Sequence, residues 1–351
     1  MKTKLQVLGV CAGNGASLYP FYKLPKYYNV VANIEPRSIF YTLKNEQWAS
    51  NYPGIRISRN FLGVQNVDII IGHPDCGSYS VLTKSTKKDK PVENKDSESL
   101  IMYLNAIKLL RPKMFLMENL PGLLNGHSKE WFQKEYPDYN FKFIEGSVSK
   151  FGNSQVSRER LVIVGINKKL GKWKFKFSDD KPKTVNELIG DLIGTEDVLK
   201  GQVAEPLDKE VSLWWDGEKV TLKKAQELWN GPLKDSKTWP GYYNCVTQPG
   251  VYKLVGDLPP KTARKQDRQF NPSGLPLTPR EMARIQGIPD EFIIYVEGGP
   301  KVEYWVNKGR ACVTKCPPYE IFTWFHKMIK KNYILKGKTK GSKEGTKKSK
   351  K

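Results

Sequence analysis

Short apolar runs that lead directly into polar residues are the feature that most constrains the fold of this chain. Residues 67–71 read Val-Asp-Ile-Ile-Ile, and Cys76 follows shortly after. A run of this kind predicts a buried parallel strand, and open α/β sheets place their chemistry beyond the carboxyl ends of such strands. We therefore predict an α/β fold in which Cys76 is a candidate nucleophile.

Two later segments combine an apolar strand with polar residues in the same way. Residues 114–117 are apolar and are followed by Glu118 and Asn119, whereas Arg158 and Arg160 immediately precede the apolar run 161–165. If these strands lie in one sheet, a thiol, a carboxylate with an amide and two guanidiniums could converge on one crevice.

These residues, in this order, resemble the cytosine-5 DNA methyltransferase family. Its members have a Pro-Cys nucleophile, a Glu-Asn-Val, a Gln-x-Arg-x-Arg and a late Leu-Thr-x-Arg-Glu-x-Ala-Arg-x-Gln-Gly. The matching segments here are 74–76 (Pro-Asp-Cys), 118–120 (Glu-Asn-Leu), 155–160 (Gln-Val-Ser-Arg-Glu-Arg) and 277–287 (Leu-Thr-Pro-Arg-Glu-Met-Ala-Arg-Ile-Gln-Gly). Each fragment is weak alone, but the ordered set is specific.

The resemblance implies a domain organisation. A Rossmann-like, S-adenosylmethionine-dependent methyltransferase domain would comprise residues 1–170 and 275–335, and a smaller target-recognition domain would occupy 171–274, inserted before the C-terminal segment. Residues 336–351 contain eight Lys and one Glu and predict a disordered tail, with non-specific DNA affinity or simple solubility as its role.

The resemblance also implies catalytic roles. The Cys76 thiolate would attack carbon 6 of cytosine, so that carbon 5 could accept a methyl group. Glu118 would bond the ring at N3 and the exocyclic amine, with Asn119 orienting its loop, whereas a surface Glu capping a turn is the alternative. Arg158 and Arg160 would hold the cytosine carbonyl and nearby groups; for Arg160, bracing the Glu118 loop is an equal alternative.

A glycine-containing turn followed by an acid predicts the cofactor site. Residues 5–10 form an apolar strand that ends in the turn 11–17, and Glu35 ends the next strand about 20 residues beyond Gly15. The family resemblance adds Pro74, Arg310 and Ala311. The complete expected set for S-adenosylmethionine is Cys11, Ala12, Gly13, Asn14, Gly15, Glu35, Pro74, Arg310 and Ala311.

Three positions depart from the family pattern near this site. Gly9 and Cys11 stand where the family has an acid and an aromatic residue, and Arg310 stands where it has the Asn of Gly-Asn-x-Val. A cation beside a sulfonium requires an anion between them, which could be the cofactor carboxylate, Glu35 or a DNA phosphate. Alternatively, the donor is carboxy-S-adenosylmethionine and carbon 5 receives a carboxymethyl group.

The charge balance predicts a nucleic-acid partner. Lys and Arg number 58 against 36 acidic residues, a formal net charge of +22, and a solvated basic surface is the alternative. Residues 81–90 are Lys-rich and predict either a mobile lid that contacts phosphates or an inert loop. The residues expected to contact double-stranded DNA, whose target base would be flipped out, are Ser80, Lys84, Lys87, Lys88 and Gln155.

Capping residues and apolar spacing predict four helices. Ser97 or Asp96 would cap a helix reaching residue 110, Thr184 would begin one reaching 193, and Thr278 with Glu281 forms a capping box. Apolar spacing predicts a helix over 318–329, which in the family lies beside the first strand.

Other features limit the class of protein. The five Cys include no Cys-x-x-Cys pair and only three His accompany them, so neither a disulfide framework nor a zinc site is expected. No apolar run has the length of a membrane span. We expect a monomeric intracellular enzyme of a bacterial cytoplasm or phage-infected cell, nucleoid-associated, and of restriction-modification or phage type. A transfer RNA methyltransferase and a catalytically silent DNA-binding homologue are the alternatives.

Overall fold

The computed structural model of this chain describes ten stretches of residues. These are 3–36, 48–75, 96–193, 213–215, 218–220, 251–260, 268–273, 277–294, 313 and 316–335. Cys76, the lysine-rich stretch 81–90 and the tail 336–351 lie outside them.

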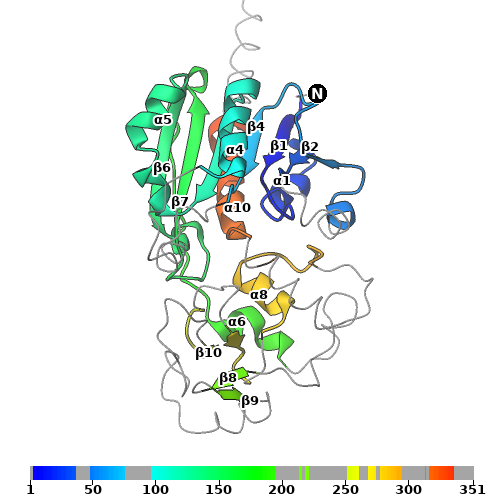
Figure 1. Ribbon diagram of the computed structural model, residues 1–351, viewed down its shortest axis with the longest axis vertical. Helices are drawn as coiled ribbons and strands as arrows, with labels where there is room; N and C mark the ends of the chain where they lie inside the picture. The colour runs from blue at the N-terminus through cyan, green and yellow to red at the C-terminus, as the bar shows by residue number, and fades with distance from the viewer. Residues whose placement is uncertain are drawn as a thin grey trace, which may run out of the picture.

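A seven-stranded sheet forms the centre of the described structure, in the order β3-β2-β1-β4-β5-β7-β6 (Figure 1). The strands in chain order are β1 (Leu5–Val10), β2 (Tyr28–Ile34), β3 (Arg56–Ser58), β4 (Ile69–Gly72), β5 (Met114–Asn119), β6 (Tyr139–Ser147) and β7 (Glu159–Asn167). The predicted α/β fold and the strands expected from the apolar runs are confirmed, although Glu118 and Asn119 belong to the end of β5 rather than to a loop after it.

Strand direction brings the polar residues to one edge of the sheet. Strands β3, β2, β1, β4 and β5 are parallel, whereas β7 is antiparallel to β5 and to β6. Because Asn119 pairs with Leu161, β7 begins where β5 ends. The start of β7 therefore lies beside the end of β5, whereas the strand order reverses between β1 and β4.

Helices cover both faces of this sheet, so the central strands are buried on both sides. On one face α1 (Tyr19–Tyr22) and α10 (Tyr319–Ile329) contribute to one hydrophobic cluster, which also includes residues of α8 (Pro279–Ile285). On the other, α4 (Glu98–Leu110) and α5 (Lys129–Glu135) contribute to a second. Figure 1 shows α4 and α10 on opposite sides of the sheet. The helix predicted over 318–329 is confirmed as α10, and it packs against α1 in a cluster that also includes residues of β1.

The capping predictions are confirmed. Ser97 caps α4 by accepting from the Leu100 amide, and Thr278 and Glu281 form the reciprocal capping box of α8. Thr184 forms a capping box with Glu187 at the start of α6 (Val185–Ile189). This helix continues as the short helix η5 (Gly190–Leu192). The remaining short helices are η2 (Pro121–Asn125), η3 (Val148–Phe151), η4 (Lys168–Leu170) and η7 (Lys330–Ile334).

Two short two-stranded sheets accompany α6 and α8 at one end of the sheet (Figure 1). They are formed by β8 (Leu213–Trp215) with β9 (Glu218–Val220), and by β10 (Val251–Lys253) with β11 (Arg268–Phe270). Among the described residues, no helix is long and apolar enough to span a membrane.

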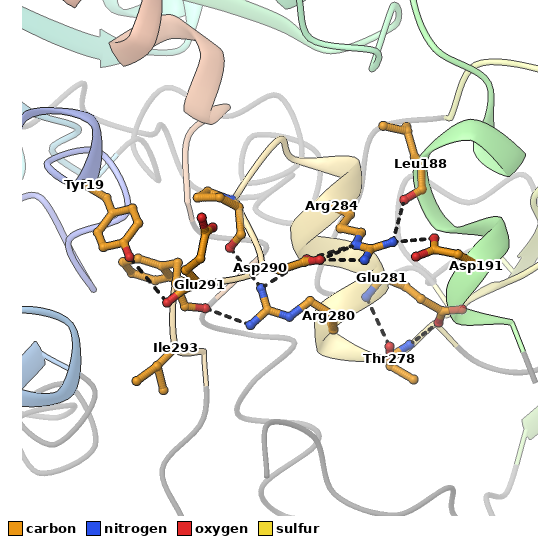
Figure 2. Close-up of polar contacts among 12 residues, drawn as sticks. Tyr19, Leu188, Asp191, Thr278, Arg280, Glu281, Arg284, Asp290, Glu291 and Ile293 are labelled. Carbon is orange, nitrogen blue, oxygen red and sulfur yellow. Dashed lines mark hydrogen bonds and ion pairs between the residues drawn. The ribbon is translucent and has the colours of Figure 1, made fainter. Parts of the chain in front are cut away.

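Charged side chains tie α8 to its surroundings, as Figure 2 shows. Arg284 pairs with Asp290 at 2.6 Å and with Asp191 of η5 at 2.5 Å. Arg280 donates to the carbonyls of Pro289 and Phe292. The two arginines of the Leu277–Gly287 motif therefore hold the segment that returns from residues 171–274 to the main sheet.

Candidate active site

The carboxyl group of Glu118 lies at the carboxyl end of β5, with Arg160 beside it. Arg160 Nε is 2.8 Å from Glu118 Oε1, and the Glu118 side chain is 8% exposed. Burial raises the pKa of Glu118 above its ordinary value, and the guanidiniums of Arg160 and Arg158 oppose that rise without cancelling it. A carboxyl group with a raised pKa can hold a proton where an ordinary Glu would have lost it.

The peptide that leads to Cys76 is bound by Asn119, the residue that follows Glu118 at the end of β5. Asn119 donates from its side-chain amide to the carbonyl of Pro74 at 3.2 Å. The Asp75 amide donates to Ser99 Oγ at 2.8 Å, and Ser97 Oγ donates to the Asp75 carbonyl at 3.2 Å. The described chain before Cys76 is thus fastened both to the strand that carries Glu118 and to the first turn of α4.

Arg158 occupies a different environment from Arg160. It is 3% exposed, and its guanidinium donates to Gln286 Oε1 at 2.5 Å and to the Cys316 carbonyl at 2.9 Å. The expected hold on a cytosine carbonyl is therefore not the arrangement found, because both terminal nitrogens bind groups inside the protein. In this structure Arg158 braces α8 and the C-terminal segment.

Gln155 likewise points inward. It is fully buried, and its side-chain amide donates to Asn153 Oδ1 and to the Ile285 carbonyl, each at 3.3 Å. The expected contact with DNA does not fit this placement, because none of its side chain is exposed. The reason is the turn before β7, which packs on the end of α8 instead of facing the crevice.

Asn153 and Glu320 were not anticipated from the sequence. Asn153 donates to Glu320 Oε2 at 2.8 Å, and the Glu320 carboxyl group packs against Gly287. Burial raises the pKa of Glu320 to about 7, although the hydrogen bond from Asn153 opposes the rise. We use the name polar junction for Asn153, Gln155, Arg158, Gln286, Cys316 and Glu320. Neither Asn153 nor Glu320 belongs to a motif that could have indicated the contact.

The predicted cofactor turn has several residues with positive φ, a backbone that is typical of turns where a ligand approaches the main chain closely. Cys11, Gly13 and Gly15 have φ values of 55°, 62° and 91°, in the left-handed region that favours glycine. The Gly13 amide donates to Glu35 Oε1 at 2.5 Å, so the turn and the acid of the second strand are in contact, as expected. Cys11 is buried and donates from Sγ to the Ser99 carbonyl at 3.4 Å.

Asn33 braces this turn and was missed in the sequence. Its side chain accepts from the Ala12 amide at 3.3 Å and donates to the Gly13 carbonyl at 3.3 Å. A side chain at Gly9 would collide with Asn33 and Leu18. The absence of an acid at position 9 was the available signal, because it indicated that another side chain fills that space.

Asn14 lies inside the turn and is 5% exposed. Its Oδ1 accepts from the Ala16 amide at 3.2 Å and from Cys316 Sγ at 3.1 Å. Its Nδ2 has no hydrogen-bond partner among the described residues. An orphaned buried donor and two glycines with positive φ fit a turn that receives a small polar ligand such as S-adenosylmethionine.

Several expected site residues lie outside the described stretches. They are the nucleophile Cys76, the DNA-contact residues Ser80, Lys84, Lys87 and Lys88, and the cofactor residues Arg310 and Ala311. Their roles remain predictions. Within the described residues no group of three or more His, Cys, Asp or Glu could hold a metal ion.

Comparison with known proteins gives a family match over most of the chain. The family described as C-5 cytosine-specific DNA methylase matches residues 6–306. The type II methyltransferase M.MthTI of Methanothermobacter thermautotrophicus is 25% identical over 277 residues, which cover 75% of this chain and 78% of that protein. M.Bpa9945I of Bacillus paralicheniformis is 28% identical over 158 residues, 39% of this chain, and the match spans about a third of its length, 35%.

The fold is shared with solved structures. A mutant DNMT2 of Spodoptera frugiperda superposes with a TM-score of 0.58 at 13% sequence identity, over 93% of this chain and 99% of that one. At this identity the likeness concerns the fold, and it confirms the Rossmann-like methyltransferase fold that the motifs predict.

Proposed function

Because this chain belongs to the family of C-5 cytosine-specific DNA methylases, which is a class of enzymes, we propose that it methylates carbon 5 of a cytosine in double-stranded DNA. The observation that carries the proposal is the buried carboxyl group of Glu118, which is paired with Arg160 and is followed in the chain by Asn119, the residue that binds the Pro74 carbonyl two residues before Cys76. The description of the family, which names DNA, supports the choice of DNA as substrate.

Cys76 is the nucleophile of this proposal. Its thiolate adds to carbon 6 of the cytosine, which makes carbon 5 electron-rich enough to take an alkyl group. A base, for which water suffices, then takes the carbon 5 proton, and elimination of the Cys76 thiolate restores the aromatic ring. The bonds from Asn119 and Ser99 to residues 74 and 75 support this role, because they limit the positions from which the next residue can act.

Glu118 is the acid that stabilises the attacked ring. Its raised pKa favours a proton on the carboxyl group, which can be donated to the ring nitrogen as negative charge develops there. Arg160 holds the carboxyl group through Nε and also donates from Nη1 to the Glu159 carbonyl at 2.7 Å. Arg160 thus fixes the direction in which Glu118 presents its acid.

S-adenosylmethionine would supply an electrophilic methyl group. The residues proposed to hold it are the turn 11–15 and Glu35, together with Pro74, Arg310 and Ala311. The Glu35 carboxylate accepts from the turn and suits ribose hydroxyls as further donors. Arg310 supports a second candidate, in which the donor carries an extra carboxylate and the product is carboxymethylcytosine.

A cytosine inside a duplex is out of reach of any side chain, so the proposal includes extrusion of the base, at a cost of a few kcal/mol. Residues 171–274 serve as the recognition domain, and the basic stretch 81–90 contacts phosphates. The net charge of +22 supports binding to a polyanion.

The test is incubation of the purified chain with labelled S-adenosylmethionine and, in parallel, duplex DNA or transfer RNA, followed by mass spectrometry of the nucleosides. We expect 5-methylcytosine in DNA alone. Product in transfer RNA alone would contradict the DNA assignment. Carboxymethylcytosine formed from a carboxylated donor, with no 5-methylcytosine from the ordinary donor, would favour the second candidate.

A further inference from the structure

The side-chain amide of Asn14 has a fixed orientation. A backbone N–H only donates, so the atom 3.2 Å from the Ala16 amide must be Oδ1, and Cys316 Sγ donates to the same oxygen at 3.1 Å. The NH2 group is therefore the part of the amide that faces away from both partners. It is buried and has no acceptor among the described residues.

An orphaned donor of this kind has an energetic cost. A buried N–H without an acceptor destabilises a fold by about 1–3 kcal/mol, and folded proteins contain few of them. The neighbours Gly13 and Gly15 carry no side chains and have positive φ values, and the rings of Trp48 and Tyr52 pack against the Gly15 side of the turn. A ligand that accepts a hydrogen bond from Nδ2 would remove this cost.

The chemistry of the turn separates two kinds of ligand group. Glu35, which accepts from the Gly13 amide, carries negative charge and suits hydroxyl donors, but repels an anion. The Asn14 NH2 group only donates, so it suits an acceptor and best of all an anionic one. S-adenosylmethionine has both groups, a ribose diol and a carboxylate.

Resting on the proposed function, we propose that Asn14 Nδ2 donates a hydrogen bond to the carboxylate of bound S-adenosylmethionine and that Cys316 is the positioning residue that orients this amide. Cys316 is itself held from the other side, because its carbonyl accepts from Arg158 Nη2 at 2.9 Å. The polar junction thereby supports the cofactor turn, which gives Arg158 a role at the donor site instead of at the base.

Binding of two probes to purified variants tests this assignment. S-adenosylhomocysteine contains the carboxylate, whereas 5′-methylthioadenosine lacks the whole amino-acid part. In Asn14→Leu we expect the dissociation constant of S-adenosylhomocysteine, measured by calorimetry, to rise about tenfold to a hundredfold, as for a lost bond to a charged group. The dissociation constant of 5′-methylthioadenosine, measured by displacement, should change less than about twofold.

Three further variants separate donation from packing. Asn14→Asp keeps the size of the side chain but replaces the donor by a carboxylate, so it should bind S-adenosylhomocysteine at least as weakly as Asn14→Leu. Cys316→Ser offers a hydroxyl to the same oxygen and should bind like the parent chain, whereas Cys316→Ala should bind more weakly. Asn29→Leu changes an exposed amide on β2 that contacts Gln6 and serves as the matched control.

Equal weakening of both probes in Asn14→Leu, or unchanged affinity for S-adenosylhomocysteine, would overturn the inference. A Cys316→Ser variant that binds as weakly as Cys316→Ala would overturn the role of the thiol. A parent chain that binds S-adenosylhomocysteine but modifies no nucleic acid would refute the proposed function while the binding assignment stands. A parent chain that does not bind it would refute both.

Discussion

The edge around Glu118 and the polar junction around Glu320 each place a carboxyl group near the guanidinium of Arg158, yet they differ in what surrounds it. Glu118 lies at the end of β5 with Arg160 alongside, and the next residue, Asn119, binds the peptide that leads to Cys76. Glu320 is enclosed by Asn153 and Gly287, where β7, α8 and α10 meet. The pKa of both acids is raised by burial. An acid with a raised pKa is therefore a candidate catalytic residue only where a substrate can approach it.

The sharpest test of this contrast is Glu118→Gln. Removing the acid should lower kcat/KM for methyl transfer by about 10²–10⁴-fold, the usual contribution of a positioned acid, with little change in stability. Labelled transfer to duplex DNA measures the effect. The control is Glu145→Gln, which removes an exposed acid of β6 that pairs with Lys129 of α5 and should keep the parent rate. A parent-like rate in Glu118→Gln would break the contrast.

Removal of Arg158 should mainly lower stability, whereas removal of Arg160 should mainly slow methyl transfer. Arg158→Ala leaves Gln286 and the Cys316 carbonyl without their partner inside the protein, so the free energy of unfolding should fall by about 2–4 kcal/mol. Arg160→Ala should cost less than about 1 kcal/mol, because Arg160 is partly exposed, but should slow transfer. Denaturant unfolding and transfer rates of both variants measure this. Equal stability losses would contradict the distinction.

Gly287 tests how tightly the junction encloses Glu320. A Cβ there would displace the Glu320 carboxyl group from Asn153, and φ is +73°, so Gly287→Ala should lower the free energy of unfolding by about 2–3 kcal/mol. Gly171 has φ of +74° but nothing within 4 Å of its Cβ position, so Gly171→Ala should cost about 1 kcal/mol. The difference between the two in urea unfolding isolates the contact with Glu320, and equal costs would show that no such contact exists.

The smallest expected effect is a pH dependence of stability. Because the pKa of Glu320 is raised to about 7 in the folded state, its proton favours folding, and this contribution is fully present below about pH 4.5 and is lost as the pH rises through 7. Relative to Glu320→Gln, which stays neutral, the parent chain should lose about 1–3 kcal/mol between pH 4.5 and 8. Parallel unfolding curves across this range would show that Glu320 does not titrate in it.

Much of the fold could be predicted from local patterns in the sequence. The apolar runs predicted β1, β2, β4, β5 and β7 but not β3 or β6. Ser97, Thr184 and Thr278 indicated the starts of three helices, because strand burial and capping depend on residues close in sequence. The meeting of Glu118 with Arg160 also followed, since both flank apolar runs.

The contacts of the polar junction and of Asn14 could not be predicted in this way. Arg158 and Gln155 are in a recognised motif, but their partners lie on α8 and the C-terminal segment. Nothing local distinguishes an arginine that faces a crevice from one that faces the interior two residues away. Asn14 with Cys316, and Asn153 with Glu320, join segments far apart in the chain, and only the packed structure reveals which pairs meet.

The central claim is that Cys76 attacks a cytosine held by Glu118, and the most direct measurement is covalent trapping on duplex DNA that contains 5-fluorocytosine. The account predicts a denaturant-resistant complex in the presence of S-adenosylmethionine, with the modified peptide mapping to Cys76, and its absence in Cys76→Ser. A complex that persists in Cys76→Ser, or a modified peptide that maps to another residue, would contradict the account.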